Sequence, residues 1–275
     1  MKKIISGLIV LVFIVMFIGP WPVDDTSFLQ EKFAQRTLKN IDTLEKSHAS
    51  SKLMAGFSQL DMTPKKGIPL GGYAARDPKA NEGYYEKIYA KALTLKNATN
   101  TVTIVNTETL LPLPELIEQV LKDCKLKRED IFFTSTHTHS GPGGYATGFI
   151  EREALGEYSA QYFKQLTTQI TKVILASRQN LQPAEMIYSV ADLDAQTAST
   201  YAYNQLKSSP SDHASLHILQ IKGANQNRIA NIISFDAHPT FFGRRNKKVS
   251  GDYPSLLMDD LQKQFNSPFI FIPGA

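Results

Sequence analysis

The chain has 275 residues, of which 42% are hydrophobic and 20% are charged. This composition is that of an ordinary globular protein and excludes an intrinsically disordered chain. Its 30 basic and 26 acidic residues give a net charge of +4 and are spread along the sequence. No recognisable nucleic-acid-binding module accompanies them, so we expect no nucleic-acid partner. The single cysteine, Cys124, excludes an intrachain disulfide and a cysteine-based zinc site.

Residues 1–25 have the pattern of a segment that enters or crosses a membrane. Lys2 and Lys3 precede an uninterrupted apolar run at 8–18, and Trp21 follows it, where an interfacial aromatic residue would lie. From the first isoleucine onward the stretch is about 20 residues long, which is just enough to span a bilayer. No small-residue cleavage site follows the apolar run. We therefore predict a transmembrane signal anchor with the domain on the exported, periplasmic or extracellular, side; a cleaved signal peptide and a secreted domain are the alternative.

Residues 26–52 are predicted to form an amphipathic linker helix between this segment and a folded domain. Apolar residues such as Phe33 and Leu38 recur there among charged ones. The folded domain is predicted at residues 53–275.

Strand-like and helix-like patterns alternate along residues 53–275. The expected strands are 57–62, 88–95, 101–106, 131–136, 185–190, 215–221, 230–235 and 268–272, and the expected helices are 112–125, 153–178 and 253–264. This order predicts an α/β or α+β fold in which helices pack on a mixed β-sheet. The sequence shows no internal repeat.

The most informative stretch is Thr-His-Thr-His-Ser-Gly-Pro-Gly-Gly at residues 136–144, directly after a short apolar strand. Residues two apart project from the same face of a strand, so His137 and His139 can face one site. His238 also ends an apolar strand, and Pro239 stops that strand. Because α/β proteins gather their sites at strand ends, we expect the three histidines to converge. Neutral imidazole is a common zinc ligand, but the spacing alone does not name the metal or the reaction.

Other patterns carry less weight. The pattern G-x-G-x-x-A at residues 141–146 matches a dinucleotide-binding fingerprint, but Pro142 and the lack of a prompt helix argue against it. The H-x-H pair also opens the signature of dinuclear metallohydrolases, whose next acidic residue and third histidine are missing here. His213 and His217 are four residues apart, but His217 lies in a strand-like run rather than on a helix.

The nine-residue string at 136–144 resembles a motif of the neutral/alkaline (non-lysosomal) ceramidase family. Four further motifs support the resemblance: Asp61-Met62-Thr63-Pro64, Gly71-Gly72-Tyr73-Ala74, Ala237-His238-Pro239-Thr240 and Val249-Ser250-Gly251-Asp252-Tyr253. Residues 53–275 are similar to the N-terminal catalytic domain of that family, and the domain is expected to be incomplete on its C-terminal side.

The resemblance implies a zinc amidohydrolase that cleaves ceramide (N-acylsphingosine) into a fatty acid and a sphingoid base. It implies that His137 and His238 bind Zn²⁺ and that His139 is a catalytic residue beside the amide. The family supplies a glutamate, a tyrosine and a serine from later positions, so this chain is expected to be inactive alone. Ala198 stands where the family has an arginine, which puts ceramide as the exact substrate in question.

Three functional hypotheses remain. The first is a membrane-associated amidohydrolase whose lipid partner is ceramide or a related N-acyl lipid. The second is a non-catalytic, membrane-anchored relative that binds a lipid or another partner. The third is a metal hydrolase of non-lipid amides or esters. The sequence does not give the oligomeric state.

Overall fold

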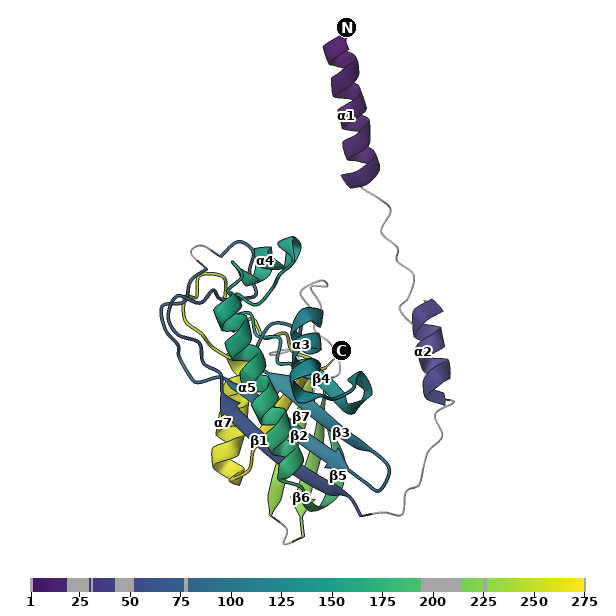
Figure 1. Cartoon of the computed structure of the whole chain (residues 1–275), viewed down its shortest axis with the longest axis vertical. Coiled ribbons are helices and arrows are strands. Elements are labelled where there is room, and N and C mark those ends of the chain that lie inside the picture. Colours follow the sequence, from purple (N-terminus) through teal and green to yellow (C-terminus); the bar gives the residue numbers. More distant parts are fainter. Residues whose placement is uncertain are drawn as a thin grey trace. The chain divides into compact units, whose positions relative to one another are not determined.

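The structure, a computed structural model, describes residues 2–18, 30, 32–42, 52–76, 79–193, 214–224 and 227–274 (Figure 1). The chain divides into two compact units, Met1–His48 and Ala49–Ala275, and each is described by itself.

The first unit contains two helices, α1 (Lys2–Ile18) and α2 (Lys32–Asp42). Among the described residues, no helix is long and apolar enough to cross a membrane. The expected transmembrane helix is therefore not supported. Helix α2 lies within the predicted linker segment at 26–52, most of whose other residues, like Trp21, lie outside the described ones.

The second unit is built on one eight-stranded sheet with the order β4-β3-β2-β1-β5-β6-β7-β8. The strands are β1 (Met54–Asp61), β2 (Tyr89–Lys96), β3 (Thr101–Thr107), β4 (Ile131–Ser135), β5 (Gln182–Leu193), β6 (Ala214–Gly223), β7 (Arg228–Phe235) and β8 (Phe269–Pro273). The helices are α3 (Pro114–Cys124), the 3₁₀ turn η2 (Arg128–Asp130), α4 (Phe149–Leu155), α5 (Ala160–Gln179) and α7 (Asp252–Phe265). The outer pairs β3–β4 and β7–β8 are parallel and the others are antiparallel. The predicted mixed sheet with packed helices is confirmed.

The two halves of the sheet have the same topology. In the first half, three antiparallel strands, β1 to β3, are followed by α3 and by β4, which is parallel to β3. In the second half, β5 to β7 are followed by α7 and by β8, which is parallel to β7. The loops after the third and fourth strands of each half therefore occupy equivalent places at the carboxyl ends of parallel strands.

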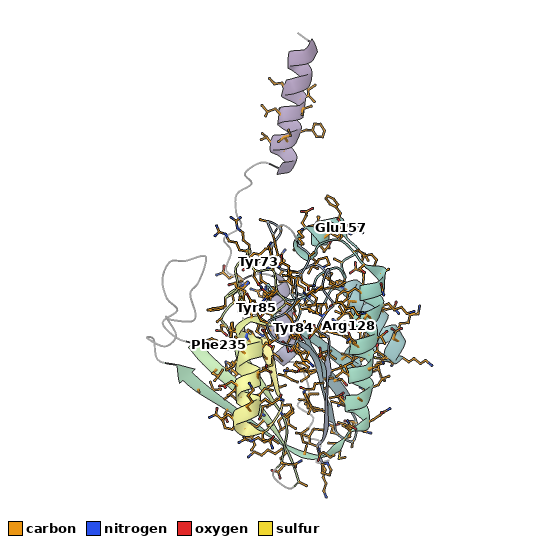
Figure 2. The ribbon with its side chains drawn as sticks, turned by 90° about the vertical axis from the view of Figure 1, so that its left-hand side faces the viewer. Tyr73, Tyr84, Tyr85, Arg128, Glu157 and Phe235 are labelled. Atoms are coloured by element: carbon orange, nitrogen blue, oxygen red, sulfur yellow. The ribbon has the colours of Figure 1, made fainter. Side chains whose placement is uncertain are left out.

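The sheet bends where its halves meet, and β1 and β5 pair there only at Met54↔Pro183 and Ala55↔Gln182. Beyond this corner the halves face each other. Asn106 of β3 donates a hydrogen bond from Nδ2 to the carbonyl oxygen of Phe271 in β8, at 2.9 Å. Apolar side chains from both halves fill the space between them. Helix α5 packs on β1, β2 and β3, α7 packs on β8, and the two helices lie on opposite sides of the strands (Figures 1 and 2).

The helix predicted at 153–178 is in fact two helices, α4 and α5. Gly156 ends α4 with φ 73°, a left-handed conformation that strongly favours glycine. A Cβ atom there would lie 2.5 Å from Cβ of Pro69. The hydroxyl of Ser159 then accepts a hydrogen bond from the backbone N–H of Tyr162 and caps α5. The apolar stripe runs through both helices, which is why periodicity alone did not show the break.

Between the sheet and α7 lies a buried ion pair, in which Nζ of Lys91 and Oε1 of Glu108 are 3.8 Å apart. The two side chains are 3% and 0% exposed. Lys91 also donates to the carbonyl oxygen of Phe269 at 2.9 Å and so joins the two halves of the sheet. Burial lowers the pKa of Lys91 and raises the pKa of Glu108, and each charge opposes the shift of the other.

We predict that Lys91→Met destabilises the fold by about 3–5 kcal/mol, because it leaves the carboxylate of Glu108 buried without an opposite charge. The double variant Lys91→Met/Glu108→Leu should recover most of this loss, since both charges are removed. Urea unfolding at neutral pH measures both values. Equal destabilisation in the single and double variants would contradict the role of the pair.

Candidate metal centre

Three imidazole rings meet at the end of the sheet. His137 and His139 lie in the loop after β4, and His238 lies three residues after β7. Their possible ligand atoms all lie within 4.8 Å of one another. The ring centroids are 5.2 Å apart for His137–His139, 4.9 Å for His137–His238 and 4.8 Å for His139–His238. The predicted convergence of the three residues is confirmed, and their separate roles stay a prediction.

The convergence does not arise from strand alternation, as the sequence suggested. Strand β4 ends at Ser135, and His137 has φ 62°, a left-handed conformation uncommon for a residue with a side chain. The imidazole of His137 is fixed by a 2.9 Å hydrogen bond between Nδ1 and the carbonyl oxygen of Leu110. When Nδ1 donates this bond, Nε2 has its lone pair free for a metal.

His139 is placed by a close approach of two backbone segments. Gly72 has φ 110°, and a Cβ atom there would lie 2.5 Å from Cα of His139. The guanidinium of Arg76, only 3% exposed, donates to the carbonyl oxygens of His139 at 2.7 Å and Gly71 at 2.8 Å. The backbone N–H of His139 donates to the carbonyl oxygen of Pro239 at 3.3 Å, which ties the loops of the two halves together.

His238 is placed by the buried carboxylate of Asp252, at the start of α7. This carboxylate accepts hydrogen bonds from the backbone N–H groups of Phe241 at 3.1 Å and Phe242 at 3.0 Å. The hydroxyl of Tyr253 donates to the carbonyl oxygen of Ala237. Helix α7 thus holds the loop on both sides of His238.

The surroundings of His139 and His238 favour neutral rings. Burial, followed by the proximity of His238 and His137, lowers the pKa of His139 to about 4. Burial and His137 also lower the pKa of His238, although Asp252 opposes this shift. Nε2 of His238 and Nε2 of His139 are 2.8 Å apart, so both nitrogens face the same point between the rings. Neutral imidazole nitrogens gathered in this way fit a zinc ion, whose sites commonly use histidine.

Several sequence expectations fall elsewhere. His213 and Ala198 lie outside the described residues. His217 is on β6, where its Nδ1 lies 2.7 Å from the hydroxyl of Tyr188, and it takes no part in the cluster. Gly143 lies against α4, where a Cβ atom would be 2.0 Å from the carbonyl oxygen of Leu155. The glycine-rich turn after the histidines is therefore packed into the protein, and the dinucleotide alternative gains no support.

Two groups that position the site, Arg76 and the carbonyl oxygen of Leu110, carry no recognisable signal in the sequence. Arg76 is one of 30 basic residues, and nothing in its neighbours shows that it is buried. The glycine pair Gly71-Gly72 beside it is a local signal for a tight turn. That signal could have led to the contact of Gly72 with His139, but not to the partner itself.

Fold and site together define a mixed α/β scaffold that carries a candidate histidine metal centre. The profile of the family described as "Neutral/alkaline non-lysosomal ceramidase, N-terminal" matches residues 53–267. The chain belongs to this family.

Relatives with similar sequences carry the same family name. Neutral ceramidase B of Dictyostelium discoideum is 24% identical over 244 residues, which cover 81% of this chain and 33% of that protein. Neutral ceramidase of Pseudomonas aeruginosa is 22% identical over 212 residues, which cover 72% of this chain and 32% of that protein. The crystal structure of neutral ceramidase from Pseudomonas aeruginosa matches with a TM-score of 0.67 and 20% identity, covering 82% of this chain and 38% of that one. The fold is therefore shared, and the chain spans about a third of the length of these sequence relatives.

We predict that Gly72→Ala destabilises the protein by about 2–4 kcal/mol, since it adds backbone strain and a clash with His139. It should also move the imidazole proton resonances of His139 and His238. Gly71→Ala is the matched control, because its added Cβ meets chiefly the end of the flexible Leu155 side chain, at 2.9 Å. Urea unfolding and NMR compare the two variants. Equal unfolding free energies and equal imidazole resonances in the two variants would show that the close approach of Gly72 to His139 is unimportant.

Proposed function

We propose that this chain is the N-terminal part of a zinc-dependent amidohydrolase that hydrolyses the amide bond of ceramide or a related N-acyl lipid. The observation that carries the proposal is the meeting of three histidines from both halves of the sheet in a member of this family. The relatives named neutral ceramidase suggest the substrate class.

We assign His137 and His238 as the zinc ligands and His139 as the catalytic residue. Zinc, when bound, would polarise the amide carbonyl and make a bound water nucleophilic at neutral pH. His137 is oriented by its contact with Leu110, and His238 by the loop that Asp252 holds. His139 is kept neutral by burial and can accept a proton at Nε2 or return one to the leaving amine. Arg76 fixes the backbone from which His139 projects.

A second assignment makes His139 a third zinc ligand. The near-equal spacing of the three rings favours it, and three histidines with one water form a known catalytic zinc arrangement. The two assignments differ in what His139→Ala does to the metal.

In the complete gene product, we predict that His137→Ala and His238→Ala each remove most of the bound zinc. His139→Ala should retain the zinc and lower amide hydrolysis by roughly 100-fold or more, because a proton-transfer group is lost. Elemental analysis of the purified proteins and a ceramide hydrolysis assay measure these effects. His217→Ala is the matched control, since His217 lies on β6 outside the cluster.

Full zinc occupancy in the His137 and His238 variants would refute the ligand assignment, and zinc loss in His139→Ala would establish the three-ligand alternative. Zinc binding without turnover of any amide or ester would favour the non-catalytic relative. Hydrolysis of short amides or esters in preference to ceramide would favour the non-lipid hydrolase. The inactivity of the isolated 275-residue chain stays a prediction, which the same assay tests.

We also propose that residues 1–25 direct the domain to the exported side of a membrane. The support is the sequence pattern of Lys2 and Lys3 before an apolar run whose side chains, from Leu8 to Met16, are exposed on α1. Membrane fractionation with N-terminal sequencing should find the protein outside the cytoplasm, either retained with the membrane or shortened to a secreted form. An intact protein in the cytoplasmic fraction would contradict export.

A further inference from the structure

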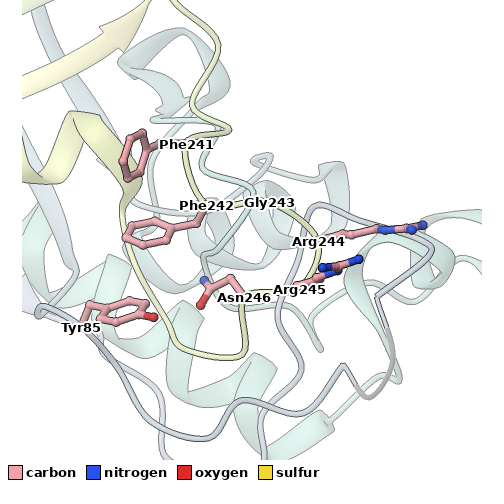
Figure 3. A pocket seen from close by; sticks show the side chains of 7 residues that line it. All are labelled: Tyr85, Phe241, Phe242, Gly243, Arg244, Arg245 and Asn246. Atoms are coloured by element: carbon pink, nitrogen blue, oxygen red, sulfur yellow. The ribbon is translucent and has the colours of Figure 1, made fainter.

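The loop at residues 241–248, which begins three residues after His238, exposes aromatic rings. Phe241 is 79% exposed. Phe242 stacks on Tyr85 with ring centroids 4.9 Å apart and an interplanar angle of 12°, and Phe241 meets Phe242 edge-on at 5.4 Å. These rings line one side of an open pocket of about 530 Å³ (Figure 3). A contiguous apolar surface that is rimmed by polar residues, as these neighbouring aromatic rings are, marks a candidate interaction site.

The same loop is strongly basic. Arg244, Arg245, Lys247 and Lys248 lie within it, and no acidic residue does. Neither arginine has a carboxylate partner among the described residues, and Figure 3 shows both guanidinium groups extending in the same direction from the loop. Lys247 pairs with Glu82 at 3.2 Å, and Nζ of Lys248 lies 5.0 Å from the ring centroid of Tyr85. The surface therefore combines exposed rings with uncompensated positive charge.

Hydrogen bonds to the rest of the domain hold the loop at 241–248 in this exposed conformation. The carboxylate of Asp252 accepts hydrogen bonds from the backbone N–H groups of Phe241 and Phe242. The guanidinium of Arg76 donates a hydrogen bond to the carbonyl oxygen of Arg244 at 3.4 Å. Asn246 donates from Nδ2 to the hydroxyl of Ser140, beside the histidine motif, at 2.9 Å. The groups that place His238 and His139 thus also hold the loop and keep its rings and arginines outward.

We propose that the loop at 241–248 docks the protein on the surface of an anionic phospholipid bilayer. The ring of Phe241 enters the boundary between headgroups and acyl chains, where exposed aromatic side chains bind favourably. The guanidinium groups of Arg244 and Arg245 bind lipid phosphates, which they match in charge and geometry. The proposal deepens the proposed function, because it sets the histidine cluster beside a lipid source. Docking itself requires neither zinc nor turnover, so the two ideas can fail separately.

A tryptophan reporter tests the docking at the loop itself. The natural chain has one tryptophan, Trp21, so Trp21→Phe combined with Phe241→Trp leaves a single fluorophore at position 241. Vesicles of phosphatidylglycerol and phosphatidylcholine should shift its emission to the blue and allow quenching by brominated acyl chains. Neutral phosphatidylcholine vesicles should give little shift, and raised salt should reduce the effect. Because the reporter senses only its own surroundings, binding through the N-terminal helix does not imitate the signal.

Matched variants separate charge at this loop from charge in general. Arg244→Ala/Arg245→Ala should weaken the anionic-vesicle response by roughly 30-fold in lipid concentration. Lys164→Ala/Lys172→Ala removes the same charge from exposed positions on α5 and should leave the response unchanged. A reporter made by Tyr188→Trp on β5 should stay in water.

Three results would overturn the proposal. The first is an unshifted reporter at position 241 with anionic vesicles. The second is a fluorescence shift equal to that of the position-241 reporter with anionic vesicles, if it occurs with neutral vesicles, in the arginine double variant, or for the reporter at position 188. The third is a reporter already buried without vesicles, which would show that protein rather than lipid covers the loop.

Discussion

The histidine cluster depends on the two halves of the bent sheet being held face to face. His137 and His139 belong to the first half and His238 to the second, so a small slide of one half would separate them. Polar bonds across the interface prevent this slide. Ser250 donates its backbone N–H to the carbonyl oxygen of Ser140, and Thr138 donates its hydroxyl to the carbonyl oxygen of Ser250. These bonds lie beside the imidazoles, where a displacement would have the greatest effect.

The shared topology of the halves explains why a site forms at this end of the sheet. Each half ends in a parallel pair of strands, and the carboxyl ends of such pairs leave loops free to carry functional groups. The bend at β1 and β5 brings the two sets of loops together. A single half would present at most two of the three histidines. Joining the halves therefore creates the site as well as the core.

The sequence predicted the strands well because their apolar runs are short and bounded by turn residues. It predicted one helix where Gly156 makes two, since the apolar stripe continues across the break. It also predicted the convergence of the histidines, but from strand alternation. The left-handed backbone conformation of His137, which actually orients this residue, cannot be recognised from the sequence. Long-range packing produces the repeated topology, the burial of Arg76 and the hydrogen bonds by which Asp252 holds the loop after His238. Local patterns do not encode such contacts.

The central claim is that loops from both halves build one metal site. Anomalous X-ray diffraction at the zinc absorption edge, on crystals of the zinc-loaded protein, tests it most directly. We expect a single strong peak about 2.0–2.1 Å from ring nitrogens of both His137 and His238. A zinc ion bound by histidines of one half of the sheet alone, or a zinc site elsewhere on the protein with none between these rings, would contradict this claim.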